Sequence, residues 1–212
     1  MNAEEAIRRM LARYRNLDSY EDSGTFSTSH WGSGLVTRFR TKYKRPSMLM
    51  FELEDMCRLL VNGNSAVLGF SVGKELEVPL GFVFGHYLED PRIVIPPLLD
   101  EFWGATSLAD SPDDYKLLPK RKAGELSLMT TRSGRLLTLD DTDFRILRFS
   151  VTPPRASIQW FQNMAIEIHY ETMRTNHLSK LDLNFDGFDQ GAGSKLAQKF
   201  RDDFIKARPK WP

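Results

Sequence analysis

Residues that alternate between apolar and polar dominate this sequence from Gly24 onward. The alternation is seen in "GTFSTSHW", "LVTRFRTKY", "SMLMFELE", "GELSLMTT", "GRLLTLDD", "FRILRFSV", "SIQWF", "AIEIHYETM" and "KLDLNF". A period of two is typical of strands with one face toward a core. Because most of these runs follow one another without helices between them, they predict a large antiparallel sheet in an α+β protein.

Two short turn sequences separate pairs of these predicted strands. In "CRLLVNGNSAVLGFS" the pair Asn62-Gly63 separates two apolar runs, and this pair favours the positive backbone angles of a tight hairpin turn. The pair Ser133-Gly134 is expected to form a second hairpin tip between two later runs. Consecutive strands are therefore expected to be neighbours in the sheet.

Three segments have a helical pattern instead. Ile7, Met10 and Tyr14 recur at helical spacing, which predicts an amphipathic helix that fades in the turn-forming stretch "NLDSYED". A short helix is expected over 98–103 after Pro96-Pro97. A tail helix is expected over 194–207, with Ser194 as its cap.

The composition narrows the possible functions. The 212 residues fit a single domain covering 1–212. With 29 basic and 28 acidic residues the net charge is +1, so no nucleic-acid partner is expected. The single cysteine, Cys57, has no partner for an internal disulfide, and no apolar run reaches the length of a membrane span. The opening "MNAEEAIRRMLARY" does not resemble a signal peptide, so we expect either a cytosolic protein or one from which a signal segment was removed.

The stretch "KLDLNFDGFDQG" begins like an EF-hand calcium loop. Asp182, Asn184, Asp186 and Gly187 match its positions 1, 3, 5 and 6, but position 12 is Gly193 where a bidentate Glu is needed. The alternation before it is typical of a strand, not of an incoming helix. We therefore expect no metal site and no cofactor, and interpret the stretch as a last strand that ends in a polar turn.

A second motif, "GFSVG", matches the G-x-S-x-G nucleophile elbow with Ser71 as nucleophile. Such an elbow needs a helix after the serine, whereas Pro79 and Gly81 follow here. His86, His169 and His177 come later in the chain, so a triad is compatible with the residue order alone. A serine hydrolase using Ser71 remains an alternative function.

The order of elements and several stretches resemble the periplasmic lipoprotein-carrier family, LolA and LolB. The stretch "KYKRPSMLMFELED" is similar to a family strand opened by an Arg-Pro pair, and "CRLLVNGNSAVLGFS" is similar to the hairpin that follows it. The stretches "GELSLMTTRSGRLLTLDDTDFRILRFSVTP" and "LDLNFDGFDQG" resemble the central strands and the closing strand. The resemblance covers about residues 3–191, and the tail helix 194–207 lies beyond it.

This resemblance implies an unclosed β-barrel whose concave face is covered by helices over a hydrophobic cavity. It implies a non-enzymatic protein of the periplasm or cell envelope that binds lipid, an acyl chain or an acylated protein. Arg45, followed by Pro46, takes the place of the arginine that holds the lid. The residues alone leave open whether the apolar side chains line a cavity or fill it, and a structural or interaction module without a small ligand is the third alternative.

Overall fold

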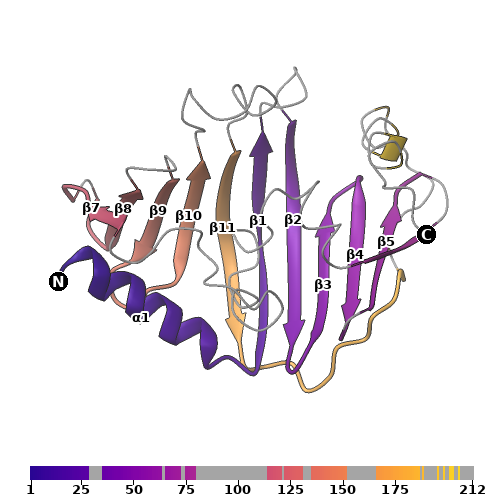
Figure 1. The fold of residues 1–212 in the computed structure, drawn as a ribbon, viewed down its shortest axis with the longest axis horizontal. Helices are drawn as coiled ribbons and strands as arrows, with labels where there is room; N and C mark the ends of the chain where they lie inside the picture. Colours follow the sequence, from indigo (N-terminus) through magenta and orange to yellow (C-terminus); the bar gives the residue numbers. More distant parts are fainter. Residues whose placement is uncertain are drawn as a thin grey trace. The chain divides into compact units, whose positions relative to one another are not determined.

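A computed structural model describes the fold (Figure 1). It describes residues 1–28, 35–63, 65–72, 75–79, 114–120, 122–130, 135–151 and 166–186, and single positions in the tail: 188, 195, 198, 201, 202 and 205.

Eleven strands of the described chain form one antiparallel sheet in the order β6-β5-β4-β3-β2-β1-β11-β10-β9-β8-β7. Strands consecutive in sequence are neighbours in the sheet, except β6 and β7, which lie at its two ends, and β1 also neighbours β11. The end strands β6 and β7 pair with no further strand of the described chain, so the sheet is open, and the predicted α+β class is confirmed. The strands are β1 (Ser19–Thr28), β2 (Leu35–Lys44), β3 (Met48–Leu53), β4 (Cys57–Asn62), β5 (Ser65–Phe70), β6 (Leu76–Pro79), β7 (Tyr115–Leu117), β8 (Glu125–Thr130), β9 (Arg135–Asp140), β10 (Ile146–Val151) and β11 (Ile166–Thr175).

The chain divides into two compact units, each described here by itself. Unit 1 holds residues 1–17, 22–38 and 92–173, and unit 2 holds residues 18–21, 39–91 and 174–212. The strands β1, β2 and β11 contribute residues to both. The expectation of a single domain over 1–212 stays a prediction.

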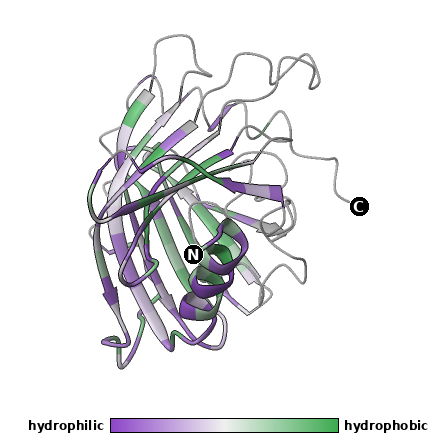
Figure 2. Cartoon of the chain, turned by 90° about the vertical axis from the view of Figure 1, so that its left-hand side faces the viewer, coloured by the Kyte–Doolittle hydropathy of each residue, from purple (hydrophilic) through white to green (hydrophobic). Residues whose placement is uncertain are grey.

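The helix α1 (Ala3–Arg15) of unit 1 confirms the predicted amphipathic helix and carries hydrophilic and hydrophobic residues (Figure 2). The Asn2 side chain caps it by accepting a hydrogen bond from the Glu5 backbone N–H. Its acidic residues lie in the first turn, and Arg13 and Arg15 lie in the last turn, which complements the helix dipole. One face is buried: Ala3, Ala6, Ile7, Met10 and Tyr14.

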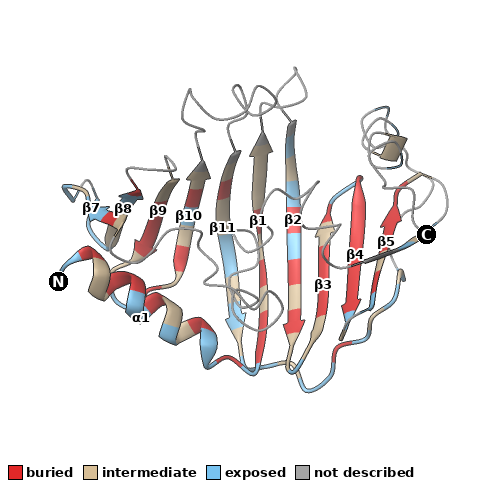
Figure 3. Cartoon of the chain, in the orientation of Figure 1, coloured by how far each residue is buried: buried red, intermediate tan, exposed pale blue. Residues whose placement is uncertain are grey.

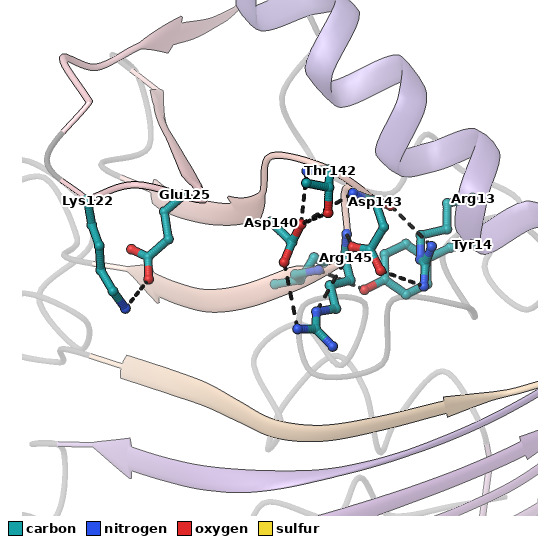
Figure 4. Close-up of polar contacts among 9 residues, drawn as sticks. Arg13, Tyr14, Lys122, Glu125, Asp140, Thr142, Asp143 and Arg145 are labelled. Atoms are coloured by element: carbon teal, nitrogen blue, oxygen red, sulfur yellow. Dashed lines mark hydrogen bonds and ion pairs between the residues drawn. The ribbon is translucent and has the colours of Figure 1, made fainter.

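Polar contacts fix the end of α1 on the turn between β9 and β10 (Figure 4). The buried Tyr14 hydroxyl accepts a hydrogen bond of 2.9 Å from the Ile146 backbone N–H. The Arg13 guanidinium donates to the Asp143 carbonyl oxygen at 3.2 Å and pairs with its carboxylate. Arg9 lies 5.3 Å from the centre of the Phe144 ring. The helix α1 therefore packs within unit 1 through its buried apolar face, and hydrogen bonds of Arg13 and Tyr14 fix its C-terminal end.

In unit 2 the strands β4 and β5 form the predicted hairpin. Asn62 pairs with Ser65, and Gly63 has φ +60°, a left-handed conformation that glycine adopts without strain. Every residue of β4 except Asn62 is buried, and Figure 3 shows this strand almost wholly in red. Since neighbouring side chains of a strand point to opposite faces, both faces of the sheet are covered at β4.

Two sequence predictions were wrong. Strand β1 begins at Ser19, inside the stretch expected to turn, because β-pairing and the Asn176 side chain satisfy this backbone: Asn176 accepts hydrogen bonds from the N–H groups of Asp18 and Ser19. The stretch "KLDLNF" forms no strand. Its carbonyl groups are bound by the side chain of Arg58 instead, as described below.

Other predicted segments are described only in part. Residues 98–103, the Ser133-Gly134 tip and the run "SIQWF" lie outside the described residues. In the predicted tail helix, the described positions are helical: Lys195, Gln198, Arg201, Asp202 and Ile205. No helix within the described part of the chain is both long and apolar enough to cross a membrane.

We predict that Tyr14→Phe destabilises the protein by about 1–3 kcal/mol, because the buried Ile146 N–H loses its acceptor while the ring still fills its space. Urea unfolding followed by circular dichroism measures this. Arg8→Ala on the same helix is the control, since its exposed ion pair with Glu4 contributes about 0.5 kcal/mol or less. Equal unfolding midpoints for Tyr14→Phe and the wild type would contradict this role of the hydroxyl.

Candidate functional site: an apolar sheet face and its rim

One face of β2–β5 in unit 2 is apolar over three consecutive rows, and we call it the apolar face. The register of the three strand pairs places its members directly opposite one another. Each is at most 3% exposed. Its twelve residues are Phe39, Thr41 and Tyr43 of β2, Leu49, Phe51 and Leu53 of β3, Cys57, Leu59 and Val61 of β4, and Ala66, Leu68 and Phe70 of β5.

The only hydroxyl groups on the apolar face belong to Thr41 and Tyr43. Thr41 lies opposite Phe51, between Phe39 and Tyr43 on its own strand. Thr41 is fully buried, and its Oγ1 has no hydrogen-bond partner among the described residues. A buried hydroxyl in this state costs about 1–3 kcal/mol relative to a hydrated one. The Thr41 hydroxyl therefore has an unused hydrogen-bonding capacity inside an apolar surrounding.

Arg45 and Pro46 lie in the turn that follows β2, next to the end of the apolar face. Arg45 is half-buried, Pro46 is exposed, and the bond between them is cis. The Arg45 backbone N–H donates to the Asp18 carbonyl oxygen at 2.9 Å, and Lys44 pairs with the Asp18 carboxylate. Burial raises the pKa of Tyr43, whereas the nearby Arg45 charge lowers it. The predicted latch residue thus lies at the rim of the apolar face, beside the Tyr43 phenol.

The opposite face of β3–β5 holds a buried arginine. Arg58 is 5% exposed and lies directly opposite Glu52, to which its Nε donates at 2.7 Å. Its Nη1 donates to the carbonyl oxygens of Asn184 at 3.2 Å and Asp186 at 2.9 Å, and the guanidinium lies 5.1 Å from the centre of the Phe188 ring. One side chain therefore holds the segment 184–188 on this face of the sheet.

Gly69 leaves room for a second contact between the sheet and this segment. A Cβ atom at Gly69 would lie 2.3 Å from Cε1 of the Phe185 ring, so the ring occupies the space that only glycine leaves. Asp182, Asn184 and Asp186 thus belong to a clamped segment, here called the strap (residues 181–186 and 188). In the described part of the chain, no group of His, Cys, Asp or Glu side chains could hold a metal ion.

The environment of Ser71 does not favour the hydrolase alternative. Ser71 directly follows β5 and is fully buried. Its Oγ donates to the Asp55 carbonyl oxygen at 2.7 Å, and its backbone N–H donates to the Met56 carbonyl oxygen. A nucleophilic serine has to give its proton to a base, whereas this proton is held by a carbonyl group. The hydroxyl of Ser71 closes the turn between β3 and β4.

Other titratable groups are also deeply buried. In unit 2, burial raises the pKa of the Cys57 thiol from 9.0 to about 12, so the thiol stays protonated at neutral pH. In unit 1, burial raises the pKa of Tyr14 and of Tyr170, and the buried Asp22 carboxylate raises both further. These phenols remain protonated at neutral pH.

The resemblance pointed to Arg45, which lies at the rim of the apolar face, and its role as a latch stays a prediction. The sequence did not point to the two buried polar groups, Thr41 and Arg58. Arg58 had one usable signal: it stands in the apolar run "CRLLV", and the hairpin-like alternation of the two runs puts it opposite Glu52. For Thr41 the sequence carries no signal, since threonine is common in strands.

Several solved structures are similar to this chain over most of their length. A LolA superfamily protein from Nitrosomonas europaea is 14% identical, with 86% of this chain and 96% of that chain covered and a TM-score of 0.40. Lipoprotein LppX from Mycobacterium tuberculosis is 10% identical (85% and 98% covered, TM-score 0.49), and LprF from Mycobacterium bovis is 9% identical (86% and 95%, TM-score 0.46).

No protein-family model matches the sequence, and no curated protein matches it.

We predict that Arg58→Met destabilises the protein by about 2–4 kcal/mol, because Glu52 loses its counter-charge and two carbonyl groups lose their donor. Urea unfolding measures the loss, and limited proteolysis should show faster cleavage around the strap. Arg38→Met is the matched control, because its ion pair with Glu171 is exposed and contributes about 1 kcal/mol at most. A variant as stable and as protease-resistant as the control would show that Arg58 does not hold the strap.

Proposed function

We propose that this chain binds a lipid or an acyl chain against the apolar face, without catalysing a reaction. The observation that carries the proposal is the apolar face itself, with one unused hydroxyl inside it and a cationic residue at its rim. Ligand sites of this kind are mostly apolar, with a few polar groups that orient the ligand. Each methylene group transferred from water to such a surface contributes about 0.8 kcal/mol.

The ligand would replace part of the packing that now buries the apolar face. Two candidate nucleophiles are not activated: the Cys57 thiol of this face stays protonated at neutral pH, and Ser71, which follows β5, donates its proton to a carbonyl group. Binding and release are therefore the chemistry we propose. The partner is a lipid or an acylated protein, and we propose the periplasm or cell envelope as the compartment, where acylated proteins are carried.

We propose that Arg45, followed by Pro46, acts as the latch of this site. Its charge lies near the Tyr43 phenol at the rim, and its backbone N–H is fixed by Asp18. A guanidinium at this place can bind the anionic or carbonyl oxygens of a ligand head group, or those of the segment that closes over the ligand.

We predict that palmitate raises the melting temperature of the purified protein by about 5–10 °C at a concentration of 100 Kd, the shift expected when ligand binds the folded state alone. Laurate should bind at least tenfold more weakly, because it buries four fewer methylene groups. Thermal shift and native mass spectrometry check this, and organic extraction identifies any lipid that is carried. Equal, negligible effects of both fatty acids would favour the alternative of an interaction module without a small ligand.

Arg45→Leu should release a bound fatty acid several-fold faster than the wild type, because the head group and the closing segment lose the guanidinium. Displacement of a fluorescent fatty acid in a stopped-flow instrument measures this rate. Arg40→Leu is the matched control, since Arg40 is an exposed cation on the other face of the same strand. Equal release rates in both variants would remove Arg45 from the site.

A further inference from the structure

We infer that the hydroxyl of Thr41 donates a hydrogen bond to the ester carbonyl oxygen of a bound O-acylated lipid. Resting on the proposed function, this assigns the preferred ligand class: a lipid with an acyl ester behind its head group, which binds more tightly than a free fatty acid or a hydrocarbon of the same chain length. The residue is Thr41 of β2, at one end of the middle row of the apolar face.

The Thr41 hydroxyl differs from the other buried hydroxyls for which the structure gives a partner. Ser71 Oγ donates to a carbonyl oxygen at 2.7 Å, Ser19 Oγ accepts from the Leu178 N–H at 3.0 Å, and Thr130 Oγ1 accepts from the Arg135 N–H at 3.2 Å. Thr41 Oγ1 is buried as deeply and has no partner in the described part of the chain. A valine would fill the same space without this cost, so the hydroxyl contributes nothing to packing that a methyl group would not.

The unit 2 surroundings of Thr41 favour a neutral ligand group over a charged one. Within unit 2 its neighbours on the face are Phe39 and Tyr43 along the strand and Phe51 of β3 across from it, while β1 pairs along the other edge of β2. A charged group placed among such side chains would carry a large desolvation cost, whereas an ester carbonyl is neutral and accepts one hydrogen bond. A hydrocarbon or an ether offers the hydroxyl a poor acceptor or none.

The distance between Thr41 and Arg45 separates an ester lipid from a fatty acid. The two residues are four apart, and a strand rises about 3.3 Å per residue, so they lie about 13 Å apart along the chain direction. A fatty acid has a single polar group, which cannot serve both positions. A lipid with a polar head at the rim and an ester further in has one group for each.

The test compares 1-palmitoylglycerol with 1-O-hexadecylglycerol, which has the same head group and chain length but no carbonyl. Displacement of a bound fluorescent fatty acid gives both affinities for the wild type, Thr41→Val and Thr41→Ser. We expect the wild type to prefer the ester by about two- to tenfold, the range of a single neutral hydrogen bond. Thr41→Val should lose this preference by weakening only ester binding, and Thr41→Ser, which keeps the hydroxyl, should retain it.

The melting temperature of the ligand-free variants shows that they are folded, and Thr41→Val should melt no lower than the wild type because it removes an unpaired buried hydroxyl. A Thr41→Val protein that still prefers the ester would overturn the role of Thr41 and leave the proposed function standing. A wild type that binds the fluorescent fatty acid but neither glycerol lipid would overturn the inference and leave the proposed function standing. A wild type that binds none of the three would overturn both.

Discussion

The register of the β4–β5 hairpin is the constraint on which unit 2 depends. Gly63 has the left-handed conformation that the turn requires, and this turn sets Asn62 opposite Ser65. A slip of one residue would move every apolar side chain of β4 to the other face. The apolar face, the Glu52–Arg58 pair and the contact of Gly69 with the strap would then be lost together.

The two faces of the sheet in unit 2 bury their side chains in different ways. The apolar face is buried with almost no polar atoms, so its stability comes from area removed from water. The opposite face buries a charge, and it does so with an opposite charge, two carbonyl groups and an aromatic ring around Arg58. The Thr41 hydroxyl, which has no partner among the described residues, contrasts with Arg58 and Ser71 of the same unit, whose side chains are hydrogen-bonded.

The sequence predicted the elements that local patterns determine. Alternation predicted most strands, helical spacing predicted α1, and Asn62-Gly63 predicted the hairpin, because each signal lies within a few residues.

The two wrong predictions of secondary structure have their cause in partners far away in sequence. "KLDLNF" alternates like a strand, but Arg58, more than 120 residues earlier, binds its backbone. The short strands β6 and β7 were also missed, since four and three residues are too few to show a period. Of the site, the rim residue Arg45 was found by resemblance, while Thr41 could not be found without the register.

The strap also determines when the packing of unit 2 is completed during synthesis. Arg58, Glu52 and Gly69 leave the ribosome long before residues 184–188, whose carbonyl groups and rings complete their surroundings. Until then the strap does not cover this face of β3–β5, so its salt bridge and its apolar side chains are exposed. The nascent chain is therefore most prone to misassembly in the interval before the strap is synthesised. Chaperones that shield sheet surfaces would act in that interval.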